Sequence, residues 1–203
     1  MRAATRLLLA ALLALTALAA LPACRGAMPA MHFYTLSPLA APAAAPAANG
    51  PSVGVGPLSI PLALDRPQIV TRAAGNELDM AEFHRWGGSL SGDILSTLTQ
   101  DLAALLGSDR VVSHPWTRFI TPDYRVPVEI HRFDGALGKE VTLAATWAVH
   151  YGDEHAPRVV RKSTLTAPVA GSDYPALVAA HSKVLGDLAR EIAAELARQK
   201  TTP

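Results

Sequence analysis

The sequence contains only one cysteine, Cys24, in 203 residues. A chain with a single cysteine has no internal disulfide framework and no cysteine-based metal site. Aromatic residues make up 5% of the sequence and are scattered, so no platform for stacking single-stranded nucleic acid is present. Charge is balanced, with 18 Lys and Arg against 17 Asp and Glu. The composition therefore carries no electrostatic footprint for nucleic acid and no basic cluster for direct membrane binding.

Long apolar runs are absent except at the N-terminus. Arg2 and Arg6 precede an apolar run from Leu7 to Leu21. A run of about 15 residues is too short for a membrane-spanning helix, which needs roughly 20. A basic start, a short apolar segment and a small residue before the cleavage point are typical of a secretory signal peptide. We predict a signal peptide over residues 1–23.

The position of Cys24 favours a bacterial lipoprotein. The three preceding residues are Leu, Pro and Ala, and a lipobox has an aliphatic residue and then small residues at these places. We predict acylation of Cys24, with residues 24–31 as a lipidated tether. Ordinary secretion is the alternative, although its cleavage favours a small residue where Leu21 stands. Arg25 follows the cysteine in place of an aspartate, which favours the periplasmic face of the outer membrane.

Cleavage removes 23 of the 203 residues and leaves 180, the size of one ordinary domain. Because the leader contains two arginines, 16 Lys and Arg then stand against 17 Asp and Glu, a net charge near −1. We predict a single domain over residues 32–200. Within it, 32–36 reads as a brief strand. The Pro/Ala-rich stretch 38–51 is expected to be a surface loop.

Several short segments have the composition or the two-residue alternation of strands. They are 53–60, 68–72, 78–86, 110–113, 124–133, 141–151 and 158–169. Pro57 indicates a sheet edge or a bulge in the first of them. A turn is expected over 62–67, a hairpin turn at Gly75-Asn76 and a hairpin loop over 134–138. Apolar residues alternate with polar ones at Val126, Val128 and Ile130, which indicates packing on one face only.

Two segments have the periodicity of amphipathic helices. In residues 89–106, leucines or isoleucine recur every four positions, Ser89 or Ser91 can cap the start, and Gly107 ends the helix. Leu95 and Leu105 are expected to widen its apolar stripe. Residues 174–199 carry a second stripe and an opposite face expected to be solvated, with Lys183, Asp187, Arg190, Glu191, Glu195 and Arg198. The order of elements predicts an α+β fold, with a mixed or antiparallel sheet and two amphipathic helices on one face.

Motifs for catalysis are weak. The segment 87–92 resembles a nucleophile elbow, but no serine has glycine both two before and two after it. A serine that caps a helix is the simpler interpretation. Residues 150–155 gather two histidines and two carboxylates, a metal-binding composition that also suits a turn. His84 and His181 are expected to be packed or hydrogen-bonded near the core. We predict no catalytic residue, no metal site and no cofactor.

One block of sequence carries a resemblance to a known family. It includes Val53-Gly54-Val55-Gly56-Pro57-Leu58, the run Leu64-Asp65-Arg66-Pro67-Gln68-Ile69-Val70-Thr71-Arg72, and Arg85-Trp86. With Phe33-Tyr34-Thr35-Leu36 near the start, the strand around Trp147 and a closing helix after Ala179, the chain resembles the ABC-type transport auxiliary lipoproteins. The resemblance extends over nearly the whole mature chain.

The resemblance implies a role without a reaction. Such a protein would be a non-catalytic outer-membrane lipoprotein that docks the periplasmic MCE protein of an ABC lipid transport system. Self-association into a ring would also fit, since MCE proteins are multimeric. The expected partner-binding residues lie on exposed turns; they are Asp65, Arg66, Pro67, Gln68, Arg85 and Trp86. The alternative is that Arg66, Pro67 and Trp86 simply hold the fold together.

Other functions remain open on the sequence. A periplasmic lipid-binding carrier would need an apolar cavity between the leucine-rich helix and the sheet. A serine hydrolase using Ser89 or Ser91 would need a histidine and an acid beside the hydroxyl. A cell-wall anchoring module would bind peptidoglycan.

Overall fold

The computed structural model describes residues 29–39, 50–116, 120–152 and 154–200. The chain divides into two units, Met1–Ala30 and Met31–Pro203, and every described helix and strand belongs to the second, which we call the body. The predicted signal peptide, Cys24 and most of the Pro/Ala-rich stretch lie outside the described residues. The expectations for those segments therefore stay predictions.

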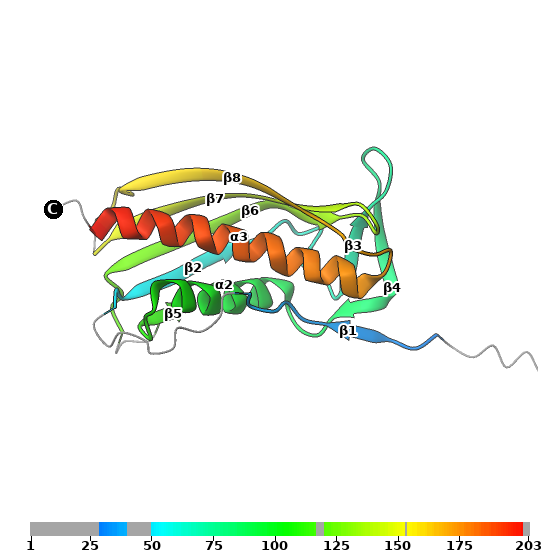
Figure 1. Cartoon of the computed structure of the whole chain (residues 1–203), viewed down its shortest axis with the longest axis horizontal. Coiled ribbons are helices and arrows are strands. Elements are labelled where there is room, and N and C mark those ends of the chain that lie inside the picture. Colours follow the sequence, from blue (N-terminus) through cyan, green and yellow to red (C-terminus); the bar gives the residue numbers. More distant parts are fainter. Residues whose placement is uncertain (1–28, 40–49, 117–119, 153, 201–203) are drawn as a thin grey trace, which may run out of the picture. The chain divides into compact units, whose positions relative to one another are not determined.

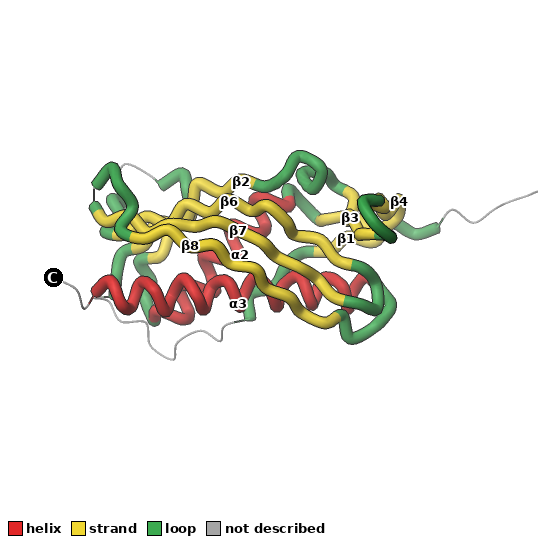
Figure 2. The backbone as a smooth tube through the Cα atoms, turned by 90° about the horizontal axis from the view of Figure 1, so that it is seen from above, coloured by secondary structure: helices red, strands yellow, loops and turns green. Residues whose placement is uncertain are grey.

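Within its described residues, the body contains two helices and eight strands (Figure 1). In chain order they are β1 (His32–Tyr34), β2 (Val53–Ser59), β3 (Gln68–Arg72), β4 (Leu78–Trp86), α2 (Leu90–Leu106), β5 (Val111–Ser113), β6 (Tyr124–Gly135), β7 (Glu140–Tyr151), β8 (Val159–Pro168) and α3 (Tyr174–Lys200). The strands form one curled mixed sheet, and both helices lie on one of its faces (Figures 1 and 2). The predicted α+β class and the placement of the helices are confirmed.

The sheet is organised around β6. This strand is antiparallel to β7, which is antiparallel to β8. On its other side β6 runs parallel to β2 along its first half and to β3 at its end. The pairs β1–β4 and β2–β5 are also parallel, whereas β3 and β4 form the predicted antiparallel hairpin. Of the two expected arrangements, the mixed sheet is the correct one.

The core lies between the sheet and the helices because each element buries one apolar side. Val126, Val128 and Ile130 of β6 are buried, as their alternation predicted, and so are Trp147 and its alternating neighbours on β7. The helix α2 contributes a stripe of buried residues: Leu90, Ile94, Leu98 and Leu102. Leu105 is 39% exposed, so the expectation that it widens this stripe is wrong.

Both ends of α2 are fixed by the residues that the sequence indicated. The Ser89 side chain accepts a hydrogen bond from the Gly92 amide at 3.4 Å. Gly107 adopts a left-handed conformation with φ of 57°, which glycine reaches without a steric penalty. Its amide and that of Ser108 bond the last carbonyl groups of the helix. Local chemistry therefore sets the length of this helix.

Two details of the sequence interpretation are wrong. The strand β6 continues through Gly135, so the expected loop over 134–138 begins later, and Asp134 is a buried strand residue. Its carboxylate is held by two hydrogen bonds from Arg72, at 3.0 and 2.8 Å, and one from Arg132 at 2.9 Å. Glu195, expected on a solvated face, has a side chain only 4% exposed beneath β8, where it bonds Arg161.

The segment after β1 is clamped across the helices. The Leu36 amide donates to the Asp93 carboxylate of α2 at 2.7 Å, and the Leu39 amide donates to Asp101 at 2.7 Å. The Ser37 amide donates to Ser182 of α3 at 3.1 Å. Residues 32–39 are therefore part of the body, although the strand predicted over 32–36 ends at Tyr34.

Candidate functional site

The turn between β2 and β3 is a preformed surface loop. The Pro61 carbonyl accepts hydrogen bonds from the amides of Leu64 and Asp65, at 2.9 and 3.2 Å. The Leu64 side chain is buried and anchors the turn from below, whereas Leu62 at its tip is 87% exposed. The turn therefore presents its side chains without needing to be ordered by a partner.

This turn and the end of β4 form one continuous surface. The Trp86 amide donates to the Pro67 carbonyl at 2.7 Å, and Gln68 is the register partner of Arg85. A shallow hollow joins Asp65, Arg66 and Pro67 to the start of α2, with Gly88, Ser89 and Leu90 on its other side. The structure thus brings the two predicted docking segments together. We call residues 62–68 and 85–89 the docking edge.

The six predicted residues occupy the docking edge in different ways. Asp65 and Pro67 are exposed, and Gln68 is half-buried. The Arg66 Nη1 lies 2.6 Å from the sulfur of Met80, and Arg85 forms an ion pair with Glu82 at 3.5 Å. Trp86 is buried, with its ring edge-on to the His181 ring at a centroid distance of 5.8 Å. Five of the residues are exposed or half-buried, whereas the burial of Trp86 fits the alternative that this residue holds the fold together.

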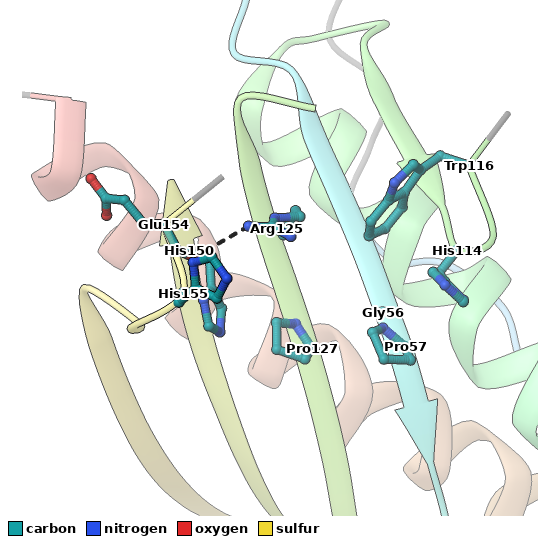
Figure 3. Close-up of a pocket in the computed structure, with 9 residues that line it drawn as sticks. All are labelled: Gly56, Pro57, His114, Trp116, Arg125, Pro127, His150, Glu154 and His155. Atoms are coloured by element: carbon teal, nitrogen blue, oxygen red, sulfur yellow. Dashed lines mark hydrogen bonds between the residues drawn. The ribbon is translucent and has the colours of Figure 1, made fainter. Parts of the chain in front are cut away.

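A second feature is a surface cleft of about 620 Å³ at the opposite end of the body (Figure 3). Its lining comes from β2, the chain after β5, β6 and the end of β7. The lining residues are Gly56, Pro57, His114, Trp116, Arg125, Pro127, His150, Glu154 and His155. Two of the histidines belong to the 150–155 segment that the sequence indicated. No sequence signal connected that segment with His114, Trp116 or Arg125.

A bulge in β2 shapes one wall of the cleft. The register between β2 and β6 shifts between Val55 and Leu58, so the expectation of an edge or bulge at Pro57 is confirmed as a bulge. Gly56 has φ of +107°, and an added Cβ there would lie 2.8 Å from the His114 Cβ. Only glycine fits this backbone conformation and this close approach.

The charged lining residues of the cleft are Arg125 and Glu154. The Glu154 carboxylate is engaged by two hydrogen bonds from Arg158, each 3.1 Å long, which hold the pKa of Glu154 below its usual value. Arg125 donates from Nη2 to the Glu154 carbonyl at 3.3 Å, while its buried Nε bonds none of the described residues. A guanidinium group among imidazoles favours phosphate or carboxylate groups. Within the described ranges, no three His, Cys, Asp or Glu side chains are grouped to hold a metal ion.

The two histidines expected near the core are there. The His84 Nδ1 is 2.8 Å from the Tyr34 hydroxyl, and its ring stacks on Tyr174 with centroids 3.8 Å apart. Burial lowers the pKa of His84, and the charge of His32 lowers it further. His181 is fully buried, with Nδ1 2.9 Å from the Leu177 carbonyl, and burial lowers its pKa to about 4. Both interpretations are confirmed.

The model for the ABC-type transport auxiliary lipoprotein component matches residues 34–193, which include the docking edge, the cleft and both helices. The chain belongs to this family. The resemblance drawn from the sequence is therefore confirmed.

Solved structures share the fold of this auxiliary lipoprotein. One is described as the crystal structure of an uncharacterized protein; it has a TM-score of 0.67 and 17% identity, over 83% of this chain and 99% of that one. Another is a Xanthomonas campestris protein with a TM-score of 0.66 and 17% identity, over 84% of this chain and 99% of that one. At this identity the likeness concerns the fold alone. No curated protein matches the chain.

The hydrolase alternative for this auxiliary lipoprotein finds no support in the geometry. The Ser89 hydroxyl caps α2 and lies 2.8 Å from the Ser91 hydroxyl. Among the residues that the structure describes, neither hydroxyl bonds a histidine. Ser89 thus performs the capping role that the sequence favoured, without the neighbouring base that a serine nucleophile requires.

The auxiliary lipoprotein has no membrane-spanning helix among its described residues, since none of those helices is both long and apolar enough.

Proposed function

We propose that this protein is a non-catalytic lipoprotein of the outer membrane that docks the periplasmic MCE protein of an ABC lipid transport system. The family, a transport auxiliary lipoprotein component, supplies the association with an ABC system. The observation that carries the docking role is the docking edge, where two separate segments form one rigid, half-polar surface. Rigid loops on a folded scaffold commonly provide binding sites.

The composition of the docking edge suits a protein partner. Arg66 and Arg85 present guanidinium groups, and arginine is enriched at the centres of protein interfaces. Asp65 adds an exposed charge of opposite sign, which favours one orientation of the partner. Pro67 and the exposed Leu62 provide apolar contact without much loss of side-chain entropy at the proline. Trp86 holds Pro67 in place through its backbone.

Acylation of Cys24 would keep this surface at the membrane. A single acyl chain gives only marginal binding, so the several chains of a lipoprotein make the anchoring firm. Anchoring also raises the local concentration of the docking edge near a partner that reaches the outer membrane. Each individual contact with the partner can then be weak.

The first test is crosslinking and capture from fractionated membranes, with the wild type beside Cys24→Ala. We expect the wild type in the outer membrane together with an MCE protein, and the variant in the soluble periplasmic fraction without it. If Cys24→Ala changes neither location nor partners, the anchored docking role is refuted.

A second test separates docking from anchoring. Asp65→Lys reverses an exposed charge on the docking edge, and Asp109→Lys reverses an exposed charge in the turn before β5. We expect Asp65→Lys to reduce the captured MCE protein and Asp109→Lys to leave it unchanged, with both variants in the outer membrane. Equal capture by the two variants would remove the docking edge from the proposal.

A lipid-binding carrier is the second candidate, and the cleft is the observation that favours it. The cleft adjoins a mainly apolar groove of about 280 Å³. The two share Pro57 and Pro127, and the groove is also lined by Leu58, Ser59, Val128, Glu129, Thr146, Trp147 and Ala148. With Glu154 paired to Arg158, Arg125 could bind the acidic headgroup of a lipid whose chains lie along the groove. This groove lies outside the space between helix and sheet where the sequence interpretation put a cavity. Lipid that copurifies with the wild type and is lost in Arg125→Gln would favour the carrier.

A further inference from the structure

Three exposed apolar side chains lie together at the end of the body where the chain enters it. Met31, Phe33 and Phe83 have exposed fractions of 41%, 66% and 37%. Met31 and Phe33 belong to the chain in and just before β1, and Phe83 belongs to β4, which pairs with β1 (Figure 1). We call these three residues the apolar patch.

The pairing of β1 with β4 places Phe33 beside Phe83. Phe33 is the register partner of Arg85, and Phe83 lies two residues before Arg85, in the stretch where the register of β4 against β3 shifts. The face opposite to Phe33 carries Tyr34 and Trp86, which pack toward α3. Tyr34 and Trp86 thus face the core, whereas Met31, Phe33 and Phe83 remain exposed.

The fold does not require aromatic residues on this outer face. A short edge strand that pairs on one side only is normally protected by charged or polar side chains, because exposed apolar edges promote association. Clustered exposed apolar side chains instead mark surfaces that contact a membrane or another protein. We therefore expect the patch to contact a membrane or another protein.

The short stretch of chain between Cys24 and the patch limits what the patch can contact. Phe33 is nine residues from Cys24 and Met31 is seven. Because an extended chain advances at most about 3.5 Å per residue, Phe33 stays within about 30 Å of an acylated Cys24. A surface so close to the anchor repeatedly meets the membrane that holds the anchor.

We propose that the apolar patch inserts into the lipid headgroup region of the membrane to which Cys24 is anchored, and so fixes the orientation of the body. This inference rests on the proposed lipidation of Cys24. The insertion is shallow, since Glu82 and Asp79 are exposed beside the patch and charged groups stay in water. The docking edge, which shares Arg85 with this face, is then held beside the membrane surface.

The chemistry of the patch also predicts how the contact depends on salt. Arg85 is paired with Glu82, so the patch carries no uncompensated positive charge to attract anionic lipid. Burial of apolar surface, which is not screened by salt, then supplies the binding. We expect contact with the bilayer to persist in high salt and in vesicles of zwitterionic phosphatidylcholine.

Fluorescence quenching on the full-length lipidated protein tests the proposal. Cys24 is the only cysteine, so once it is acylated a cysteine introduced elsewhere is the single thiol available for a probe. Glu82→Cys places a probe beside the patch, and Asp109→Cys places one near β5. In vesicles of zwitterionic phosphatidylcholine with brominated acyl chains, which offer no negative charge to the Arg85 that Glu82→Cys leaves unpaired, we expect quenching at position 82 and none at position 109.

Two further variants make the result specific. Adding Phe33→Ser to Glu82→Cys should abolish the quenching, whereas Leu105→Ser, which removes an exposed leucine of α2, should leave it intact. Equal quenching at positions 82 and 109 overturns the proposal. So does crosslinking between patches of two copies that replaces the quenching, because the occupant is then a second copy of this chain.

The failure of this inference can be told from the failure of the proposed function. If the parent protein reacts with a maleimide, Cys24 is not acylated and the anchored role itself fails. If the parent is unreactive, reaches the outer membrane and captures the MCE protein while the probe at position 82 is unquenched, only the membrane contact of the patch is refuted.

Discussion

The two ends of the body assemble their surfaces in different ways. The docking edge is built from a turn and a hairpin that lie within about thirty residues of each other. The cleft gathers side chains from β2, the chain after β5, β6 and the 150–155 segment, which lie far apart in the sequence (Figures 1 and 3). A surface of the first kind can be inferred from local sequence, and one of the second kind depends on register between distant strands.

The largest expected effect comes from breaking the link between the docking end and the rest of the sheet. Asp134 of β6 bonds Arg72 of β3, and although burial raises the pKa of this carboxyl, the two arginines lower it below its usual value. Asp134→Ala removes three hydrogen bonds from the partly exposed Arg72 and Arg132 to a buried carboxylate, and we expect a loss of about 3–4 kcal/mol in the free energy of unfolding.

Chemical denaturation measures that loss, and hydrogen exchange locates it. Faster exchange in 68–86 than in 114–127 would identify the docking end as the affected one. Asp187→Ala is the matched control, because Asp187 forms surface pairs with Lys183 and Arg190 that are worth less than about 1 kcal/mol. Similar losses of stability in the two variants would contradict the expectation that Asp134 stabilises the body more than a surface ion pair does.

The pH dependence of stability tests the end of the body that carries the docking edge, because the buried His181 packs against Trp86 there. Its folded pKa of about 4 lies below the ordinary value of 6.5, so between these values the unfolded chain binds a proton that the folded chain does not. Stability therefore rises with pH across this window and is lost on acidification, by about 3 kcal/mol in total at about 1.4 kcal/mol per unit. Denaturation midpoints between pH 4 and 7 measure it.

His181→Leu is expected to flatten this dependence. His131→Gln, a change at an exposed histidine, should retain the full slope. An unchanged slope in His181→Leu would assign the acid sensitivity to other groups.

Substitutions at two glycines test the difference between the cleft and the docking edge, with smaller expected changes in the free energy of unfolding. Gly56→Ala requires a strained backbone and a contact 2.8 Å from the His114 Cβ, so we expect a loss of about 1–3 kcal/mol and a reshaped cleft. At the docking edge Gly88 has no atom within 4 Å of an added Cβ, and Gly88→Ala should be near neutral. Thermal unfolding of both variants measures the two losses of stability, and equal losses would contradict this expectation.

The smallest effect on stability is expected for Arg125→Gln. Arg125 is half-buried and bonds only a carbonyl group among the described residues, so the change should stay within about 0.5 kcal/mol. Binding of a short-chain phosphatidic acid, followed by calorimetry, should be lost. Unaltered binding would show that the cleft does not select anions, and capture of the MCE protein should be unaffected in either case.

Much of the fold follows from local signals. The Ser89 cap, the left-handed Gly107 and the alternation of Val126, Val128 and Ile130 each act within a few residues. The adjacency of 62–68 and 85–89 also follows from a hairpin that the sequence predicted, since the outer ends of paired strands lie side by side. The predicted members of the docking edge remain predictions as partner contacts.

The rest depends on long-range register. Nothing in β1 indicates that it runs parallel to β4, and that pairing is what places Phe33 beside Phe83. The burial of Glu195 depends on β8 passing over α3 and supplying Arg161. Periodicity on a single helix described Glu195 as solvated because it carries no information about which strand lies above.

The clamp after β1 has a mechanical consequence. Any tension on an anchored tether enters the body along β1, whose hydrogen bonds to the parallel β4 are then stressed together in shear instead of opening one by one. Force that is transmitted beyond β1 acts on the hydrogen bonds from the Leu36 and Leu39 amides. Their acceptors, Asp93 and Asp101, both belong to α2. A pull on the anchor is thereby shared among several bonds, and the tether moves the body as one piece without peeling its first strand away.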